Sequence, residues 1–246
     1  KEIGMINTSF VNPNGLPIYD LQNPKALPKE NISTARDIAK LGKYMFDNYE
    51  KEVVAITDMQ TYSYPERNFQ KNNTNALLGI IPAVDGIKTG YTGNAGYCLA
   101  FSMVVDKDKD NEIRHRMIGV VLGANHKEKR TSASLSILRY GKENFSTKRV
   151  MEKDQLIGKK YIKGLEELEV TLKSEDELYA TLKNTENLKS QITLKELKYP
   201  VKKGDTIGVI KYFTETGQVI GSVDIISAND VDNISFITKI KMIFTD

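Results

Sequence analysis

The chain has 246 residues, of which 40% are hydrophobic and 27% are charged, so it suits one large globular domain or two modest ones. Its 35 basic and 32 acidic residues leave a net charge of only +3, spread along the chain, which argues against a nucleic-acid partner. The two histidines, His115 and His126, have no ligand-like spacing around them, so we expect no metal site and no cofactor.

The first third of the sequence predicts irregular structure and then one helix. Residues 1–32 carry the turn signals Asn-Pro and Gly, as in NPNGLP and NPKALP. A helix is predicted over 33–49, because Ser33 or Thr34 can cap it and Asp37 stands at the capping-box position. Apolar residues at helical spacing predict one buried face on this helix: Ile38, Leu41, Met45 and Tyr49.

The middle of the chain predicts strands followed by a second helix. Apolar runs at 84–91, 96–105 and 114–123 are typical of strands, with a charged loop joining the last two as a long hairpin. Cys98, the single cysteine, lies in one of these runs and is interpreted as a small buried hydrophobe rather than a nucleophile. A helix is predicted over 129–145, with four residues facing inward: Ala133, Ile137, Leu138 and Phe145.

The composition and the length of the predicted segments change near residue 150. Short segments rich in Val, Ile and Thr then recur every 8 to 15 residues, separated by Gly and Pro, and one pair flanks a Thr-Glu-Thr-Gly turn. This spacing is typical of a small all-β module. We therefore predict two domains, over residues 1–148 and 149–246.

A Lys-Thr-Gly tripeptide at 88–90 is the strongest candidate for chemistry. It follows an Asp-Gly turn and stands at the start of a predicted strand. Lys88 offers a cation, Thr89 a hydroxyl and Gly90 room for close approach, which together suit a peptide carboxylate laid along a strand edge. The tripeptide alone is a weak signal, and an ordinary surface lysine beside a turn glycine is the alternative.

Longer stretches strengthen this interpretation. The segments TSFVNPNGLP, STARDIAKLGKYM, VDGIKTGYTGNAGYCLAFS and PVKKGDTIGVIKYFTETGQVIGSVDIISANDV together resemble the low-molecular-mass penicillin-binding proteins, the serine-type D-alanyl-D-alanine carboxypeptidases. The resemblance covers nearly the whole chain. It implies an α+β fold: part of a penicillin-binding-protein/β-lactamase-like domain, with an antiparallel sheet and helices, followed by a small all-β domain.

The resemblance also implies roles for five residues. Lys88 would support proton transfer and substrate electrostatics, and Thr89 would bind the terminal carboxylate of D-alanine. Gly90 would keep the strand edge open, and the backbone N–H of Tyr91 would be one oxyanion-hole donor. Arg130 would help to hold the substrate carboxylate, which suits a guanidinium, although an ordinary surface arginine is an equal alternative.

The family's nucleophile motif, Ser-x-x-Lys, does not occur in these 246 residues. The nearest matches place arginine at the last position, and arginine cannot serve as the base. The one Ser-x-Asn, Ser227-Ala-Asn229, lies in the β module and is interpreted as a chance match. We therefore expect the C-terminal part of an enzyme, inactive alone, with strand 114–123 at an open edge. Three outcomes stay open for this edge: a separate N-terminal segment pairs with it, an edge pairs in a homo-oligomer, or the first domain is partly disordered.

The implied function is trimming of peptidoglycan stem peptides that end in D-Ala-D-Ala, in cell-wall biosynthesis and cell shape, with β-lactams bound by the intact enzyme. The implied location is the cell envelope outside the cytoplasmic membrane, with the intact protein held at the membrane. The C-terminal residues 239–246 read as a strand rather than as an amphipathic anchor helix. A non-catalytic module that binds peptidoglycan peptides or a partner stays open as the alternative.

Overall fold

The computed structural model describes residues 2–109, 111–162, 165–197 and 200–231, so the prediction for residues 239–246 lies outside the described residues. Two compact units make up the chain. One comprises residues 1–107 and 114–144, and the other comprises residues 108–113 and 145–246. The boundary at 148/149 proposed from the sequence falls within strand β6, Phe145–Met151.

Helix α1, Ala35–Thr57, begins where the capping signal predicts. Thr34 is extended, and its hydroxyl accepts a hydrogen bond from the backbone N–H of Asp37 at 3.2 Å. The helix continues eight residues beyond the predicted end at 49, past a kink at Tyr49, whose backbone angles are not helical. Gly42, Phe46 and Val53 are buried on this helix, whereas Tyr49 is 52% exposed, so the buried face is rotated from the predicted one.

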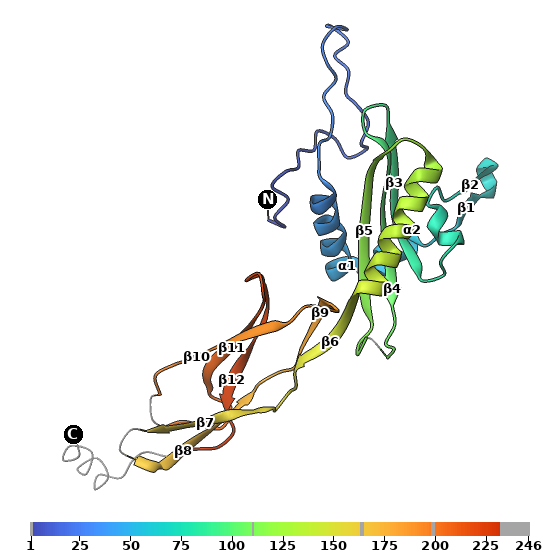
Figure 1. The fold of residues 1–246 in the computed structure, drawn as a ribbon. Coiled ribbons are helices and arrows are strands. Elements are labelled where there is room, and N and C mark those ends of the chain that lie inside the picture. The colour runs from blue at the N-terminus through green and yellow to red at the C-terminus, as the bar shows by residue number, and fades with distance from the viewer. Residues whose placement is uncertain (1, 110, 163–164, 198–199, 232–246) are drawn as a thin grey trace. The chain divides into compact units, whose positions relative to one another are not determined.

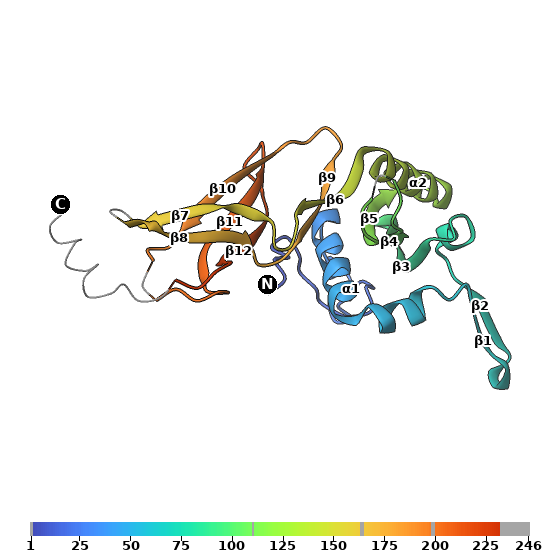
Figure 2. The same ribbon diagram turned by 90° about the horizontal axis from the view of Figure 1, so that it is seen from below.

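Three antiparallel strands form the sheet of the first unit, in the order β3-β4-β5. Helix α1 lies against β3 and β5, while helix α2, Lys127–Asn144, covers the opposite face (Figures 1 and 2). Gly42 permits the close approach of α1, since a side chain there would meet Ile87 and Ile118 at 3.2 and 3.3 Å. The strands are β3 (Val84–Thr92), β4 (Gly96–Val105) and β5 (His115–Ala124).

The core of the first unit lies between the sheet and α2. Leu99, Phe101 and Leu138 are at most 2% exposed there. Gly119 is required opposite Phe101, because an added Cβ would stand 2.0 Å from the ring. The second helix was predicted to within two residues at each end, but Ile137 is 40% exposed rather than inward-facing, and Phe145 begins strand β6 instead of ending the helix.

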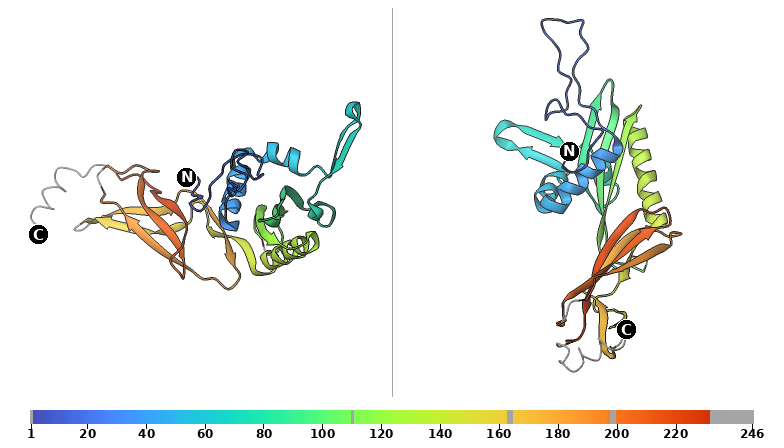
Figure 3. Two further views of the ribbon diagram at one scale, coloured as in Figure 1. Left: turned by 90° about the horizontal axis from the view of Figure 1, so that it is seen from above. Right: turned by 90° about the vertical axis from the view of Figure 1, so that its left-hand side faces the viewer.

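Two extensions project from this unit (Figure 3). Residues 9–32 form an arm that is closed at its base by pairing of Ser9 with Ile32 and further out by Ile18 with Lys29. A two-stranded hairpin follows α1. Its elements, with the short helix after it, are β1 (Thr61–Tyr64), η1 (Pro65–Arg67), β2 (Phe69–Asn72) and η2 (Ala76–Gly79).

The second unit is built from strands, as the sequence predicted. Its five-stranded sheet has the order β10-β11-β12-β8-β7, and β6 pairs separately with β9. Val170, Leu172 and Ile225 are among its most buried side chains. The predicted turn is present, since the N–H of Gly217 donates to the carbonyl of Thr214 at 3.0 Å between β11 and β12. The remaining strands are β7 (Leu156–Ile162), β8 (Leu165–Ser174), β9 (Leu178–Lys183), β10 (Leu188–Leu194), β11 (Thr206–Thr214) and β12 (Val219–Ser227).

Across the described ranges of the chain, neither helix combines the length and the apolar character that crossing a bilayer requires.

Candidate active site

The Lys-Thr-Gly tripeptide lies on β3, which is one of the two outer strands of the three-stranded sheet. Lys88, Gly90 and Tyr91 are exposed and Thr89 is half-buried. The Lys88 ammonium donates to the carbonyl of Thr89 at 2.6 Å. An outer strand pairs on one side only, so alternate backbone N–H groups of β3 point away from β4 and can meet an extended peptide.

The start of β3 is fixed by a charged cluster. Arg116 on β5 donates from Nη1 to both carboxylate oxygens of Asp85 at 2.6 Å, and Ser102 on β4 donates to the same carboxylate at 2.6 Å. Arg116 also pairs with Glu50 at 2.6 Å and stacks 3.8 Å from the centre of the Phe46 ring. These contacts join all three strands to α1 directly before the Lys-Thr-Gly residues.

This cluster stabilises the ionised form of Arg116. Burial opposes the ionised form of the guanidinium, but the hydrogen bonds and negative charges of Asp85 and Glu50 outweigh it and raise the pKa of Arg116 above its ordinary value. The side chains of Arg116 and Asp85 are only 13% and 12% exposed, so this ion pair is largely removed from water.

The loop before η2 and the end of α1 are each tied to β3 by a hydrogen bond. Asn75 caps η2 and donates from Nδ2 to the carbonyl of Gly86 at 2.9 Å. Thr57, at the end of α1, donates to the carbonyl of Asp85 at 2.6 Å. Consequently residues 73–75 are held beside the strand that carries Lys88 and Thr89.

Thr74 connects two of the predicted site residues. Its hydroxyl lies 2.5 Å from the hydroxyl of Thr89, and its carbonyl accepts a hydrogen bond from Arg130 Nη2 at 3.0 Å. Thr89 comes from β3 and Arg130 from the first turn of α2, so the structure brings together residues 41 positions apart. The local sequence around Thr74 is an Asn-rich loop, and nothing in that pattern marks this residue as a link.

Arg130 is not a surface arginine. It is 5% exposed, and its Nε is buried without a hydrogen-bond partner. Among the residues that the structure describes, no carboxylate lies within ion-pair distance of it. A buried cation with an unpaired donor is costly unless an anion satisfies it, so Arg130 is suited to bind one.

The Ser-Thr-Ala-Arg-Asp segment anchors the N-terminal residues. The Asp37 carboxylate accepts hydrogen bonds from the N–H of Asn7 and the hydroxyl of Thr8, both at 2.8 Å, while Lys40 lies 3.6 Å away. Burial favours the neutral carboxyl, but the bonds from Thr8 and Asn7 and the charge of Lys40 outweigh it and lower the pKa of Asp37. The capping-box spacing predicts only the cap role of Asp37, because its contacts with Asn7 and Thr8 join residues about 30 positions apart.

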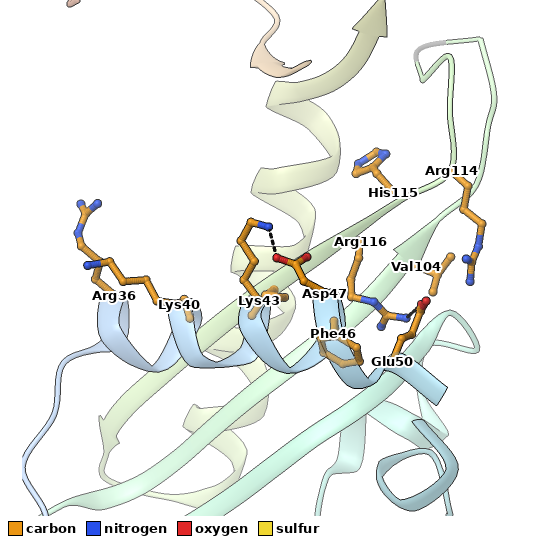
Figure 4. A pocket seen from close by; sticks show the side chains of 12 residues that line it. Arg36, Lys40, Lys43, Phe46, Asp47, Glu50, Val104, Arg114, His115 and Arg116 are labelled. Carbon is orange, nitrogen blue, oxygen red and sulfur yellow. Dashed lines mark hydrogen bonds and ion pairs between the residues drawn. The ribbon is translucent and has the colours of Figure 1, made fainter. Parts of the chain in front are cut away.

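A cavity of about 640 Å³ lies along α1 and the outer strand β5, away from the Lys-Thr-Gly edge (Figure 4). Its walls include the apolar side chains of Phe46, Val104 and Ile118 and the basic side chains of Arg36 and Lys40. In the described part of the sheet β5 has a strand on one side only, as expected from the sequence. This edge and its cavity are therefore open to a further strand.

Two other sequence candidates have local roles. Cys98 is half-buried rather than buried, because it stands at the start of β4, where its thiol donates to the carbonyl of Ala95 at 3.4 Å. Ser227 donates to the carbonyl of Asn229 within a turn of the β unit. In the described ranges no three His, Cys, Asp or Glu side chains gather as metal ligands would.

Comparison with known families decides the assignment. Residues 1–126, more than half of the chain, match the family model of the D-alanyl-D-alanine carboxypeptidases. The chain belongs to the D-alanyl-D-alanine carboxypeptidase family. Residues 145–233 match the model of the C-terminal domain of penicillin-binding protein 5, which accounts for the β unit of this family member.

Individual relatives agree with the family. The chain is 28% identical over 252 residues to the D-alanyl-D-alanine carboxypeptidase DacF of Bacillus subtilis, covering 100% of this chain and 60% of that protein. It is 27% identical over 250 residues to DacA of Haemophilus influenzae, covering 98% of this chain and 57% of that protein. The chain thus spans about three-fifths of the length of these curated relatives.

Solved structures give the same fold. Penicillin-binding protein 5 from Haemophilus influenzae superposes with a TM-score of 0.65 at 28% identity, covering 94% of this chain and 63% of that one. PBP3 from Streptococcus pneumoniae, at 22% identity, shares the fold with a TM-score of 0.66. The match covers 94% of this chain and 66% of the PBP3 chain. The partial penicillin-binding-protein domain and the following β domain expected from the sequence are thereby confirmed.

Proposed function

We propose that this chain forms the carboxylate-binding and oxyanion side of a serine-type D-Ala-D-Ala carboxypeptidase that trims peptidoglycan stem peptides. The observation that carries the proposal is the position of Thr74, which links the hydroxyl of Thr89 to the buried guanidinium of Arg130 beside the exposed β3 edge. A hydroxyl and an unsatisfied cation at one point suit the terminal carboxylate of a peptide.

In the proposed reaction a serine hydroxyl attacks the carbonyl of the penultimate D-alanine. The bond to the terminal D-alanine breaks, that residue leaves with a proton, and water then hydrolyses the acyl-enzyme ester. Thr89 and Arg130 hold the leaving residue by its carboxylate. The N–H of Tyr91 stabilises the negative charge on the attacked carbonyl, Gly90 leaves room at the edge, and Lys88 supplies positive charge that assists proton transfer.

The serine and its lysine base are supplied, in this proposal, by a segment outside these 246 residues. The absence of Ser-x-x-Lys from the sequence supports this. So does the edge of β5 that has no neighbouring strand among the described residues, because strands of such a segment can pair there. The complete enzyme would bind β-lactams at the same carboxylate site. It would act outside the cytoplasmic membrane in the cell envelope and be held at the membrane.

A non-catalytic peptide-binding module is the second candidate, and the same missing motif favours it. Fluorescent penicillin separates the two. The 246-residue chain should form no covalent adduct in either case, whereas the chain joined to the reading frame that precedes its Lys1 codon should form one only if the enzyme proposal holds. A covalent adduct on the 246-residue chain alone would contradict the proposed origin of the nucleophile.

A further inference from the structure

The arm of residues 9–32 touches the sheet at the far end of the candidate site. Both carboxylate oxygens of Glu30 accept from Asn94 Nδ2 at 3.1 Å. Asn94 lies in the turn between β3 and β4, whose geometry is fixed by Thr92, since its hydroxyl accepts from the N–H of Ala95 at 3.0 Å. Glu30 is thus held directly beyond the end of the strand that carries Lys88 and Thr89.

The direction of a bound peptide follows from the proposed function, on which this inference rests. The terminal carboxylate lies at Thr89 and the scissile carbonyl at the N–H of Tyr91. The substrate therefore runs antiparallel to β3, with its preceding residues passing Tyr91 toward Thr92 and the β3–β4 turn. One residue of extended chain spans about 3.3 Å, so the residue before D-Ala-D-Ala comes opposite the end of β3.

The carboxylate of Glu30 at the end of β3 favours a positively charged group. Glu30 is half-buried, and among the described residues it takes part in no ion pair. Its hydrogen bonds come from a neutral amide, which leaves the negative charge uncompensated. Tyr91 and Tyr97 stack beside the path with ring centres 4.4 Å apart, and Tyr91 is 59% exposed, which offers an apolar surface to an aliphatic stem.

We infer that Glu30, held by Asn94, forms a specificity subsite for a side-chain ammonium on the residue that precedes D-Ala-D-Ala. The aliphatic part of that side chain lies along the rings of Tyr91 and Tyr97, and its ammonium pairs with Glu30 at the turn. The arm that carries Glu30 therefore makes the site selective for stem peptides with a basic side chain at this position.

Two tripeptides test the subsite by NMR titration of the 246-residue chain: acetyl-lysyl-D-Ala-D-Ala and acetyl-norleucyl-D-Ala-D-Ala, which lacks only the ammonium. The lysyl peptide should bind about two- to fivefold more tightly at low salt, as a partly exposed ion pair allows, and the difference should shrink as salt is raised. The side-chain amide of Asn94 should shift with the lysyl peptide and not with the norleucyl one.

Glu30→Gln supplies the decisive comparison, because glutamine can still accept from Asn94 but carries no charge. It should abolish the preference for the lysyl peptide and leave binding of the norleucyl peptide unchanged. Glu66→Gln, which removes the same charge from the hairpin, should leave the preference intact. If Glu30→Gln keeps the preference, or weakens both peptides equally, Glu30 only pins the arm and the inference is wrong.

The norleucyl peptide separates this inference from the proposed function. If it binds wild-type chain and the two peptides do not differ, the subsite is wrong while the carboxylate site stands. If neither peptide shifts the amide resonances of Thr89 and Tyr91, the proposed carboxylate site is contradicted, and the subsite, which depends on that site, is contradicted too.

Discussion

Arg116 Nη1 donates hydrogen bonds to both carboxylate oxygens of Asp85, each at 2.6 Å, and Asp85 stands three residues before Lys88. Removing one partner leaves the other charged and largely buried, so Arg116→Met should lower the free energy of unfolding of the first unit by about 3 kcal/mol. Chemical denaturation followed by circular dichroism measures this change. Lys43→Ala, which breaks the exposed pair with Asp47, is the matched control and should have little effect, so equal losses would contradict this role of Asp85.

Gly119 is predicted to tolerate no side chain. Alanine there would place a Cβ 2.0 Å from the Phe101 ring in the middle of the sheet, so Gly119→Ala should destabilise the unit by about 1–3 kcal/mol. Gly79→Ala is the control, because nothing lies within 4 Å of a Cβ at that position. Thermal unfolding of the two variants should differ clearly, and similar melting temperatures would refute the packing described for β4 and β5.

Asp37 should make stability depend on pH in the acid range. Its pKa is lowered in the folded chain, so its contribution is fully present above the ordinary carboxyl value of 3.8 and is lost as pH falls through the folded pKa. Asp37→Asn should therefore be less stable than wild type at pH 6, with the gap narrowing below pH 3.8. Urea denaturation across this range measures the gap, and a gap that stays constant with pH would contradict the assignment.

Thr74 should act as a positioning residue. Thr74→Val keeps the volume but removes the hydroxyl next to Thr89, so acetyl-D-Ala-D-Ala should bind about fivefold more weakly, the equivalent of one hydrogen bond of about 1 kcal/mol. Thr74→Ser should restore binding, since it keeps the hydroxyl. If serine and valine bind the peptide alike, the hydroxyl contact has no part in recognition.

Much of the fold was accessible from the sequence because the signals are local. The cap at Thr34 and the apolar runs of β3, β4 and β5 place these elements correctly to within a residue or two. The continuation of α1 past Tyr49 was missed, because tertiary contacts at Val53 and Thr57 stabilise a segment with weak helical periodicity.

The site was less accessible, because its contacts join distant residues. Lys88 and Thr89 were singled out by a motif, but the burial of Arg130 and its link through Thr74 depend on how α2 meets the loop before η2. The pairing of Asp85 with Arg116 spans 31 residues and two strands, so no spacing rule reveals it. Ile137 was misplaced for a related reason, since the helix face that meets the sheet is set by packing.

The central claim is that the β3 edge at residues 88–91 binds the terminal carboxylate of a D-Ala-D-Ala peptide. NMR titration of the 246-residue chain with acetyl-D-Ala-D-Ala and with its C-terminal amide tests this directly. The Thr89 and Tyr91 amides should show saturable shifts with the free acid, and this response should be lost with the C-terminal amide or in Thr89→Val. Equal shifts with acid and amide, or none with either, would contradict it.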